Sequence, residues 1–133
     1  MLAVGQAKLG IEDENLVKAM GPFGGGLGAN GEVCGALIGA LATLGLRFSR
    51  GNEKERDDLK VWSYSQELVK RFQEDVVKVY NSFLCRDISK VDWKDMDQYK
   101  RFYKGEGGKF LECQRIVGET VELVAELLDR SLK

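Results

Sequence analysis

The sequence predicts an all-α fold, a single-domain irregular bundle of four to six helices over residues 1–133. Apolar residues recur at three- and four-residue steps in several segments, which is the pattern of helices with one buried face. No period-two alternation runs long enough to require a sheet, and no internal repeat is visible. With 44% hydrophobic and 31% charged residues, a chain of 133 residues is long enough to bury a core of its own.

Two helices are predicted before the glycine-rich part of the chain. Residues 1–9 follow a helical pattern that Gly10 ends. A second, short helix runs from about Asp13 to Met20. Asp13 or Glu14 lies in its first turn, where a carboxylate interacts favourably with the helix dipole.

The next segment, residues 21–31, cannot hold a helix because it is rich in glycine and contains the chain's only proline. After it, Val33 to Leu46 is apolar almost all round, so as a helix it must be surrounded by other elements. Its small residues predict a smooth face for close helix approach: Gly35, Ala36, Gly39 and Ala40.

The second half of the chain predicts two long helices and a shorter one between them. A helix from about Glu53 to Phe83 is expected to be the longest, with Asn52 and Glu55 as an N-cap pair at its start. Residues 86–105 suggest a short helix, in which aromatic residues and neighbouring cations are interpreted as core packing: Trp93, Lys94, Tyr99, Lys100, Arg101, Phe102 and Tyr103. A final helix runs from roughly Lys109 to Leu132.

Charge and composition exclude several classes of function. Twenty basic and twenty-one acidic residues are interleaved, which argues against nucleic-acid binding. The apolar run from Val33 to Leu46 would be about 21 Å long as a helix, short of the roughly 30 Å membrane core. We therefore expect no membrane insertion, and because no secretory signal is evident, a cytoplasmic protein. The chain has no histidine, which excludes histidine-based catalysis and histidine ligation.

Three cysteines are the candidate reactive groups: Cys34, Cys85 and Cys113. Cys34 falls in the first turn of its predicted helix, where the dipole and unpaired N–H groups would lower the pKa of the thiol. Against this, unreactive cysteine is often a small apolar filler of the core. Cys85 and Cys113 are far from Cys34 and from each other in the sequence, and packing explains each of them alone. Cys113 lies on an apolar stripe and is expected to point into the core.

The glycine segment also allows two readings. Residues 26–31 satisfy the pattern G-x-G-x-x-G, but a helix rather than a strand precedes them, which argues against a dinucleotide site. The segment is either a tight turn between helices or a place where the backbone approaches another chain segment, a cluster or a small anion. The candidate cofactor-binding residues are Gly24, Gly25, Gly26, Gly28 and Gly35.

Over almost its whole length the chain resembles the C_GCAxxG_C_C family, small proteins with four separated cysteines and a Cys-Gly-Ala-x-x-Gly motif. Residues 23–28, 31–41 and 44–46 look like the central block of the family, with Cys34-Gly35-Ala36 and Gly39 as the motif. Cys85 and Cys113 resemble its third and fourth cysteines. The family carries a further cysteine before the first helix and this chain has none. Either Met1 lies a few residues inside that helix, which the pattern of residues 1–9 favours, or this member has lost the cysteine.

The resemblance implies a redox role, and we expect the three cysteines to converge between helices. The preferred hypothesis is thiol–disulfide exchange or electron transfer with a redox partner, in which Cys34 attacks and Cys85 or Cys113 resolves. One alternative is a metal centre, an iron–sulfur cluster or zinc, held by the same three cysteines. The other is a non-catalytic interaction module, for example a homodimer formed through residues 33–46.

Overall fold

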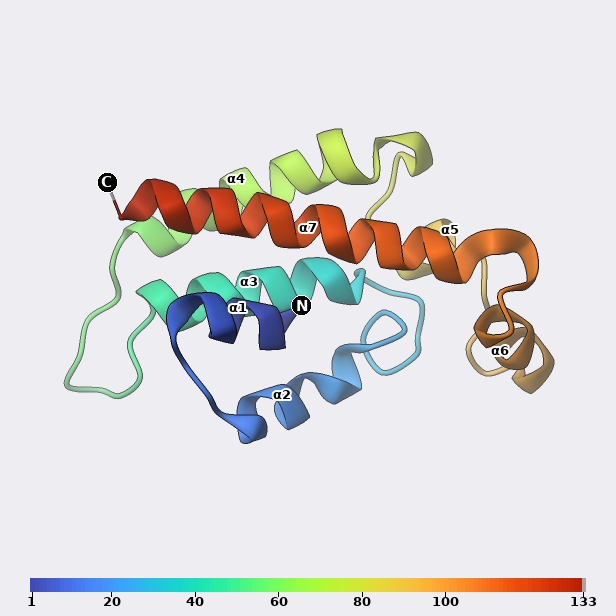
Figure 1. Cartoon of the computed structure of the whole chain (residues 1–133), viewed down its shortest axis with the longest axis horizontal. Coiled ribbons are helices and arrows are strands. Elements are labelled where there is room, and N and C mark those ends of the chain that lie inside the picture. Colours follow the sequence, from blue (N-terminus) through green and yellow to red (C-terminus); the bar gives the residue numbers. More distant parts are fainter. Residues whose placement is uncertain (133) are drawn as a thin grey trace.

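The computed structural model describes residues 1–132, which form seven α-helices joined by short helical turns and loops (Figure 1). These are α1 (Leu2–Leu9), α2 (Glu14–Met20), α3 (Gly35–Phe48), α4 (Lys60–Arg71), α5 (Cys85–Ser89), α6 (Met96–Tyr103) and α7 (Lys109–Ser131). The described residues contain no strand beyond an isolated bridge between Val33 and Leu84. The all-α prediction is confirmed, but the expected count of four to six helices is too low.

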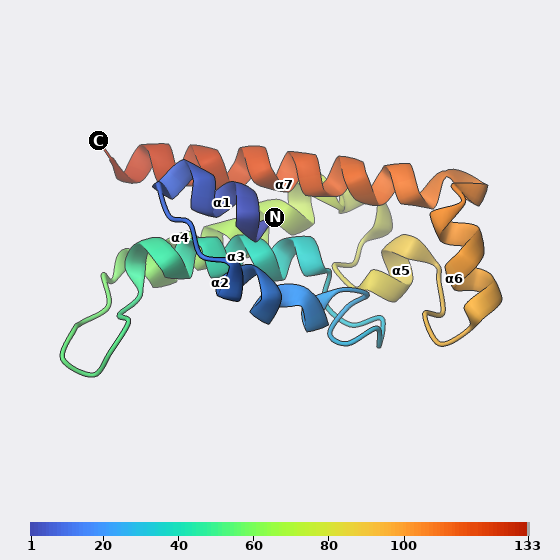
Figure 2. The ribbon, with the colours of Figure 1, turned by 60° about the horizontal axis from the view of Figure 1, so that its bottom comes forward.

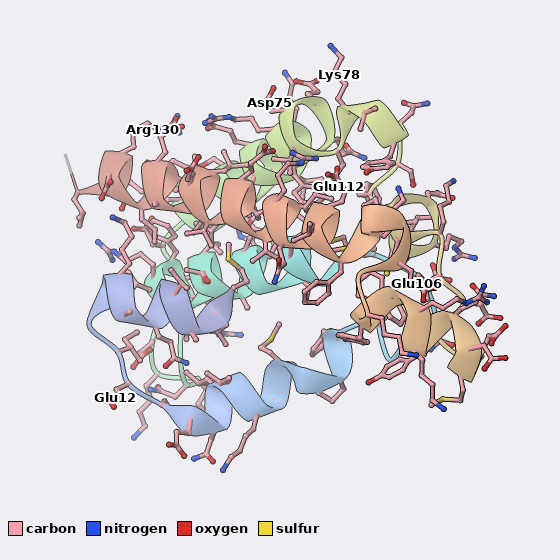
Figure 3. All side chains as sticks on the ribbon, turned by 45° about the vertical axis from the view of Figure 1, so that its right-hand side comes forward. Glu12, Asp75, Lys78, Glu106, Glu112 and Arg130 are labelled. Atoms are coloured by element: carbon pink, nitrogen blue, oxygen red, sulfur yellow. The ribbon has the colours of Figure 1, made fainter. Side chains whose placement is uncertain are left out.

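The long helix α7 spans the molecule, and α1, α3 and α4 pack along it (Figures 1 and 2). Leu44 of α3, Leu68 of α4 and Leu127 of α7 are completely buried where these helices meet. Since α3 is apolar on nearly every side, it can only be stable when neighbouring elements cover it. Charged side chains such as Asp75 and Lys78 project outward from the bundle (Figure 3).

Several local predictions for the first half of the chain are confirmed. Helix α1 ends at Gly10, whose φ of 70° places it in the left-handed conformation that commonly terminates helices. Asp13 caps α2 by accepting a hydrogen bond from the backbone N–H of Asn15. The smooth face of α3 is used as expected, because a Cβ atom at Gly39 would lie 2.8 Å from Cβ of Met1.

The predicted helix from Glu53 to Phe83 is wrong in two respects. Asn52 and Glu55 are hydrogen-bonded, but they stabilise a loop, and α4 begins only at Lys60. After Arg71 the chain passes through a π-helical turn, Phe72–Val76, and a 3₁₀ turn, Lys78–Tyr80. The extra residue of a π turn shifts the register of a helix. The chain therefore leaves the helix axis, and Cys85 opens a separate helix, α5, which raises the count to seven.

Ion pairs on the outer surface connect α4 with α7. Arg71 forms two hydrogen bonds with Glu126, and Arg130 forms two with Glu67. These paired contacts align the two helices, although exposed ion pairs contribute little net stability. None of the described helices is long and apolar enough to cross a membrane.

Candidate functional site: a cavity lined by three cysteines

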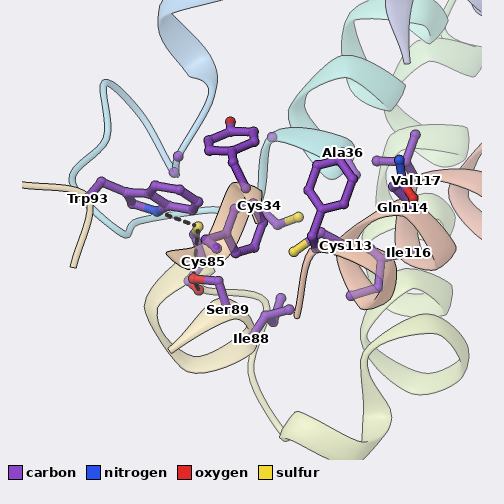
Figure 4. Close-up of a pocket in the computed structure, with 16 residues that line it drawn as sticks. Cys34, Ala36, Cys85, Ile88, Ser89, Trp93, Cys113, Gln114, Ile116 and Val117 are labelled. Atoms are coloured by element: carbon purple, nitrogen blue, oxygen red, sulfur yellow. Dashed lines mark hydrogen bonds between the residues drawn. The ribbon is translucent and has the colours of Figure 1, made fainter. Parts of the chain in front are cut away.

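Cys34, Cys85 and Cys113 line one cavity of about 440 Å³ (Figure 4). The cavity lies where the start of α3, the short helices α5 and α6, and the first turns of α7 come together. All three side chains are partly buried free thiols. The structure thus brings together the three residues that the sequence singled out, although they are widely separated along the chain.

A short antiparallel contact places Cys34 beside Cys85. The backbone N–H of Cys34 donates to the carbonyl of Phe83 at 2.9 Å, and that of Cys85 donates to the carbonyl of Glu32 at 2.6 Å. These two bonds flank the bridge between Val33 and Leu84. Each cysteine directly follows a bridge residue, so both side chains project from the same face of the pair as diagonal neighbours.

Cys34 is the N-cap residue of α3 and not a member of its first turn. Burial raises the pKa of its thiol, and the nearby backbone N–H groups of Ala36 and Leu37 offset this only in part. The expectation that the pKa of Cys34 would be lowered is therefore wrong. The reason is that, in this apolar surrounding, the free-energy cost of removing a thiolate from water is larger than the stabilisation that the N–H groups at the start of α3 provide.

Cys113 lies in the second turn of α7 and lines the cavity, not the packed core that the sequence predicted. Burial, together with the negative charges that Cys34 and Cys85 would carry as thiolates, raises the pKa of its thiol to about 11. The sulfur atoms of Cys34 and Cys113 point toward one another in Figure 4. At neutral pH, Cys113 is therefore a protonated thiol beside Cys34.

Cys85 is the only one of the three thiols whose sulfur accepts a hydrogen bond from the ring nitrogen of a side chain. Trp93 Nε1 donates to Cys85 Sγ at 3.3 Å (Figure 4). The Ser89 hydroxyl lies 3.7 Å from the same sulfur and donates to the carbonyl of Cys85 at 2.8 Å. Hydrogen bonds to a sulfur anion favour that charged form.

Sequence reasoning missed Trp93 as a site residue and interpreted it as core packing. Its ring does pack edge-to-face on Phe102, with centroids 4.9 Å apart, and Phe102 is buried. Its neighbours Tyr99 and Tyr103 are exposed, so only part of this aromatic group belongs to the core. Trp93 lies in the loop between α5 and α6, so no single helix or strand carries both it and Cys85, and no local pattern could have linked them.

The predicted cofactor-binding glycines fall into two groups. Gly25, Gly26 and Gly35 line the cysteine cavity, whereas Gly24 and Gly28 line only a separate hollow beside Tyr99, which Gly25 also borders. Gly26 has a φ of 74°, and a Cβ atom there would lie 2.5 Å from the backbone nitrogen of Glu32 and 2.7 Å from Cys85 Cβ. Glycine at this position therefore lets the loop backbone lie close to the segments that carry Glu32 and Cys85, which is one of the two expected roles.

The donor set does not form a ready metal site. Among residues 1–132, no three or more cysteine, aspartate or glutamate side chains are grouped so that they could hold a metal ion. The three thiols share a cavity but do not surround one point in it. An iron–sulfur cluster or zinc ion would require these side chains to rearrange.

Comparison with known proteins identifies the family of the chain. No curated protein and no solved structure shows a significant match to the chain. The model of one family, described as "Putative redox-active protein (C_GCAxxG_C_C)", matches residues 1–127. The protein therefore belongs to the C_GCAxxG_C_C family.

Proposed function

We propose that the protein is a thiol–disulfide redox protein whose cavity cysteines alternate between thiol and disulfide forms. The observation that carries the proposal is the convergence of Cys34, Cys85 and Cys113 on one cavity. It is supported by the description of the family as redox-active. In a reducing cytoplasm, the expected location, the resting form is the free thiols.

Cys85 is the attacking thiol in this proposal. The thiolate is the nucleophile in disulfide exchange, and the N–H group of Trp93 is positioned to stabilise it on Cys85. Burial raises the pKa of both Cys34 and Cys113, which keeps those thiols protonated near neutral pH. This reverses the assignment expected from the sequence, in which Cys34 attacks first.

Cys34 is the resolving thiol. The Cys85 thiolate attacks one sulfur of a substrate disulfide, forms a mixed disulfide and releases the other sulfur as a thiolate. Cys34 then loses its proton and attacks the sulfur of Cys85, which releases the second substrate thiolate. Both released thiolates take up protons, so the substrate disulfide becomes two thiols while two protein thiols become one disulfide.

The backbone geometry suits this pair. Diagonal neighbours in an antiparallel pair have Cα atoms about 7–8 Å apart, slightly beyond the upper limit of about 7 Å for a disulfide. The segments that carry Cys34 and Cys85 are joined by a single bridge and not by an extended sheet. A small movement of either segment therefore closes the gap, and α3 and α7 need not separate.

The test is equilibration of the reduced protein with mixtures of oxidised and reduced dithiothreitol, followed by mapping of disulfides by mass spectrometry. We expect a Cys34–Cys85 disulfide in the wild type and in Cys113→Ser, which serves as the matched control. Cys34→Ser should lose it. Absence of any disulfide among the three cysteines at every ratio would overturn the proposal.

A further inference from the structure

The walls of the cysteine cavity carry no formal charge. Of the described residues that line it, none is lysine, arginine, aspartate or glutamate. Apart from the thiols, polar side-chain atoms come from Ser89, Trp93, Tyr103 and Gln114. Burying a charged group here without a partner would be costly, so the chemistry of the walls favours a neutral ligand.

The residues that line the cavity favour a ligand with a flat ring. Four aromatic side chains gather on one part of the lining: Trp93, Phe102, Tyr103 and Phe110. Phe102 packs edge-to-face on both Trp93 and Phe110, with centroids 4.9 Å and 5.6 Å away. Bare backbone at Gly26 and Gly35 lines another part. Aromatic rings favour stacked or edge-on contact with another ring, and about 440 Å³ is within the range of small-molecule sites.

We propose that this cavity binds a neutral quinone, which accepts the electron pair released when the cysteines form their disulfide. The proposal rests on the proposed function and names the electron acceptor. A quinone is flat and uncharged, and its two-electron product, the hydroquinone, is uncharged too. The apolar cavity therefore accommodates both the oxidised and the reduced ligand without burying a charge.

The reaction balances within this site. The sulfur atoms of Cys34 and Cys85 form one S–S bond, and the two electrons released reduce both quinone carbonyls to hydroxyl groups. One proton comes from the Cys34 thiol. The other is the proton of the Cys85 thiol, which reaches the quinone by way of solvent. The amide of Gln114 and the hydroxyl of Tyr103, both on the cavity wall, are the groups available to donate hydrogen bonds to the quinone oxygens.

The first experiment measures binding and turnover with duroquinone, in which every ring carbon open to thiol addition carries a methyl group. The chain has two tryptophans, so Trp62→Phe leaves Trp93 as the only indole reporter. We expect saturable quenching of Trp93 fluorescence without oxygen, and one hydroquinone formed for each Cys34–Cys85 disulfide. An analogue with one methyl replaced by a carboxymethyl group should bind at least about tenfold more weakly, because its charge would be buried unpaired.

Two variants on α7 locate the site. Val117 lines the cavity and Leu111 does not. Val117→Phe should weaken duroquinone binding about tenfold by filling part of the cavity, whereas Leu111→Phe should leave it unchanged. Equal affinity of both variants, or equal affinity of wild-type protein for the charged analogue, would overturn the proposal.

The outcomes separate this inference from the proposed function. If oxidised dithiothreitol forms the Cys34–Cys85 disulfide but duroquinone neither binds nor oxidises the protein, the quinone proposal is wrong and the thiol–disulfide function stands. If duroquinone binds but neither oxidant produces a disulfide, the proposed function fails, and the electron-transfer step fails with it.

Discussion

The indole nitrogen of Trp93 lies 3.3 Å from the sulfur of Cys85 and donates a hydrogen bond to it. This contact joins the loop before α6 to the first residue of α5, and it distinguishes Cys85 from the other two thiols. A hydrogen bond to a charged acceptor contributes roughly 1.5–3 kcal/mol, which is enough to change the reactivity of the sulfur.

Replacing Trp93 with phenylalanine removes the donor but keeps a ring against Phe102. We expect Trp93→Phe to slow the alkylation of Cys85 by iodoacetamide near neutral pH about tenfold, since a loss of roughly 1.4 kcal/mol corresponds to that factor. Mass spectrometry of the labelled peptides resolves the rate at each cysteine. Trp62→Phe, at an exposed position on α4, is the control and should not change the rate. Equal rates in both variants would show that the indole N–H does not act on Cys85.

The pKa of Cys113 predicts a distinct pH profile. Because burial and neighbouring thiolates raise the pKa to about 11, its alkylation rate should keep increasing with pH up to about 11. In Cys34→Ala one negative neighbour is absent, so the thiolate of Cys113 forms more easily and its profile should move to lower pH. Cys85→Ala should produce a smaller shift, because Cys34 exerts the stronger of the two charge effects. If the pH profile of Cys113 were the same in Cys34→Ala as in the wild type, the two sulfurs would not be close enough to interact.

Gly26 provides a test of how the glycine loop shapes the cavity. Gly26→Ala combines a strained positive φ with a Cβ atom 2.5 Å from the Glu32 nitrogen, and we expect a loss of about 3 kcal/mol or more in the free energy of unfolding. Gly105→Ala is a matched control with a φ of 80° and no atom within 4 Å of the added Cβ. Its cost should be about 1 kcal/mol, from backbone strain alone. Urea unfolding measures the loss of free energy of unfolding in both variants. Equal losses would mean that the loop around Gly26 moves enough to accommodate the added Cβ atom.

Local signals predicted those elements whose boundaries are set by neighbouring residues. Gly10 ends α1 and Asp13 caps α2, each through conformational preferences that act within a few residues. The apolar segment after the glycine loop forms α3, close to its predicted extent. The helix predicted from Glu53 to Phe83 failed because its periodicity continues through a π turn, where the backbone changes direction while apolar residues still face the core.

The candidate site could be predicted only in part. The cysteines stood out by residue type and family resemblance, but a single bridge between Val33 and Leu84 aligns Cys34 with Cys85, and such a pairing leaves no period-two pattern. The direction of the Cys34 pKa also depends on burial by other elements, which outweighs the local effect of its position at the start of α3. Tertiary contacts therefore determine the surroundings of each thiol.

Local packing predicts opposite effects for alanine at Gly5 on α1 and at Gly118 on α7. A Cβ atom at Gly5 would lie 2.3 Å from Oγ1 of Thr43, a fully buried side chain that donates a hydrogen bond to the carbonyl of Gly39. Gly5→Ala should therefore lower the free energy of unfolding by about 2–3 kcal/mol, since neither helix can move without breaking core contacts.

Gly118 lies on the exposed side of α7, and an added Cβ there would meet no atom within 4 Å. Gly118→Ala should raise the free energy of unfolding by about 0.5–1 kcal/mol, because alanine loses less backbone entropy than glycine when a helix forms. Urea unfolding of both variants gives the two signs directly. A stabilising Gly5→Ala would mean that α1 does not pack against Thr43 in solution. A destabilising Gly118→Ala would mean that Gly118 is in close contact with another part of the protein, contrary to its open position on α7.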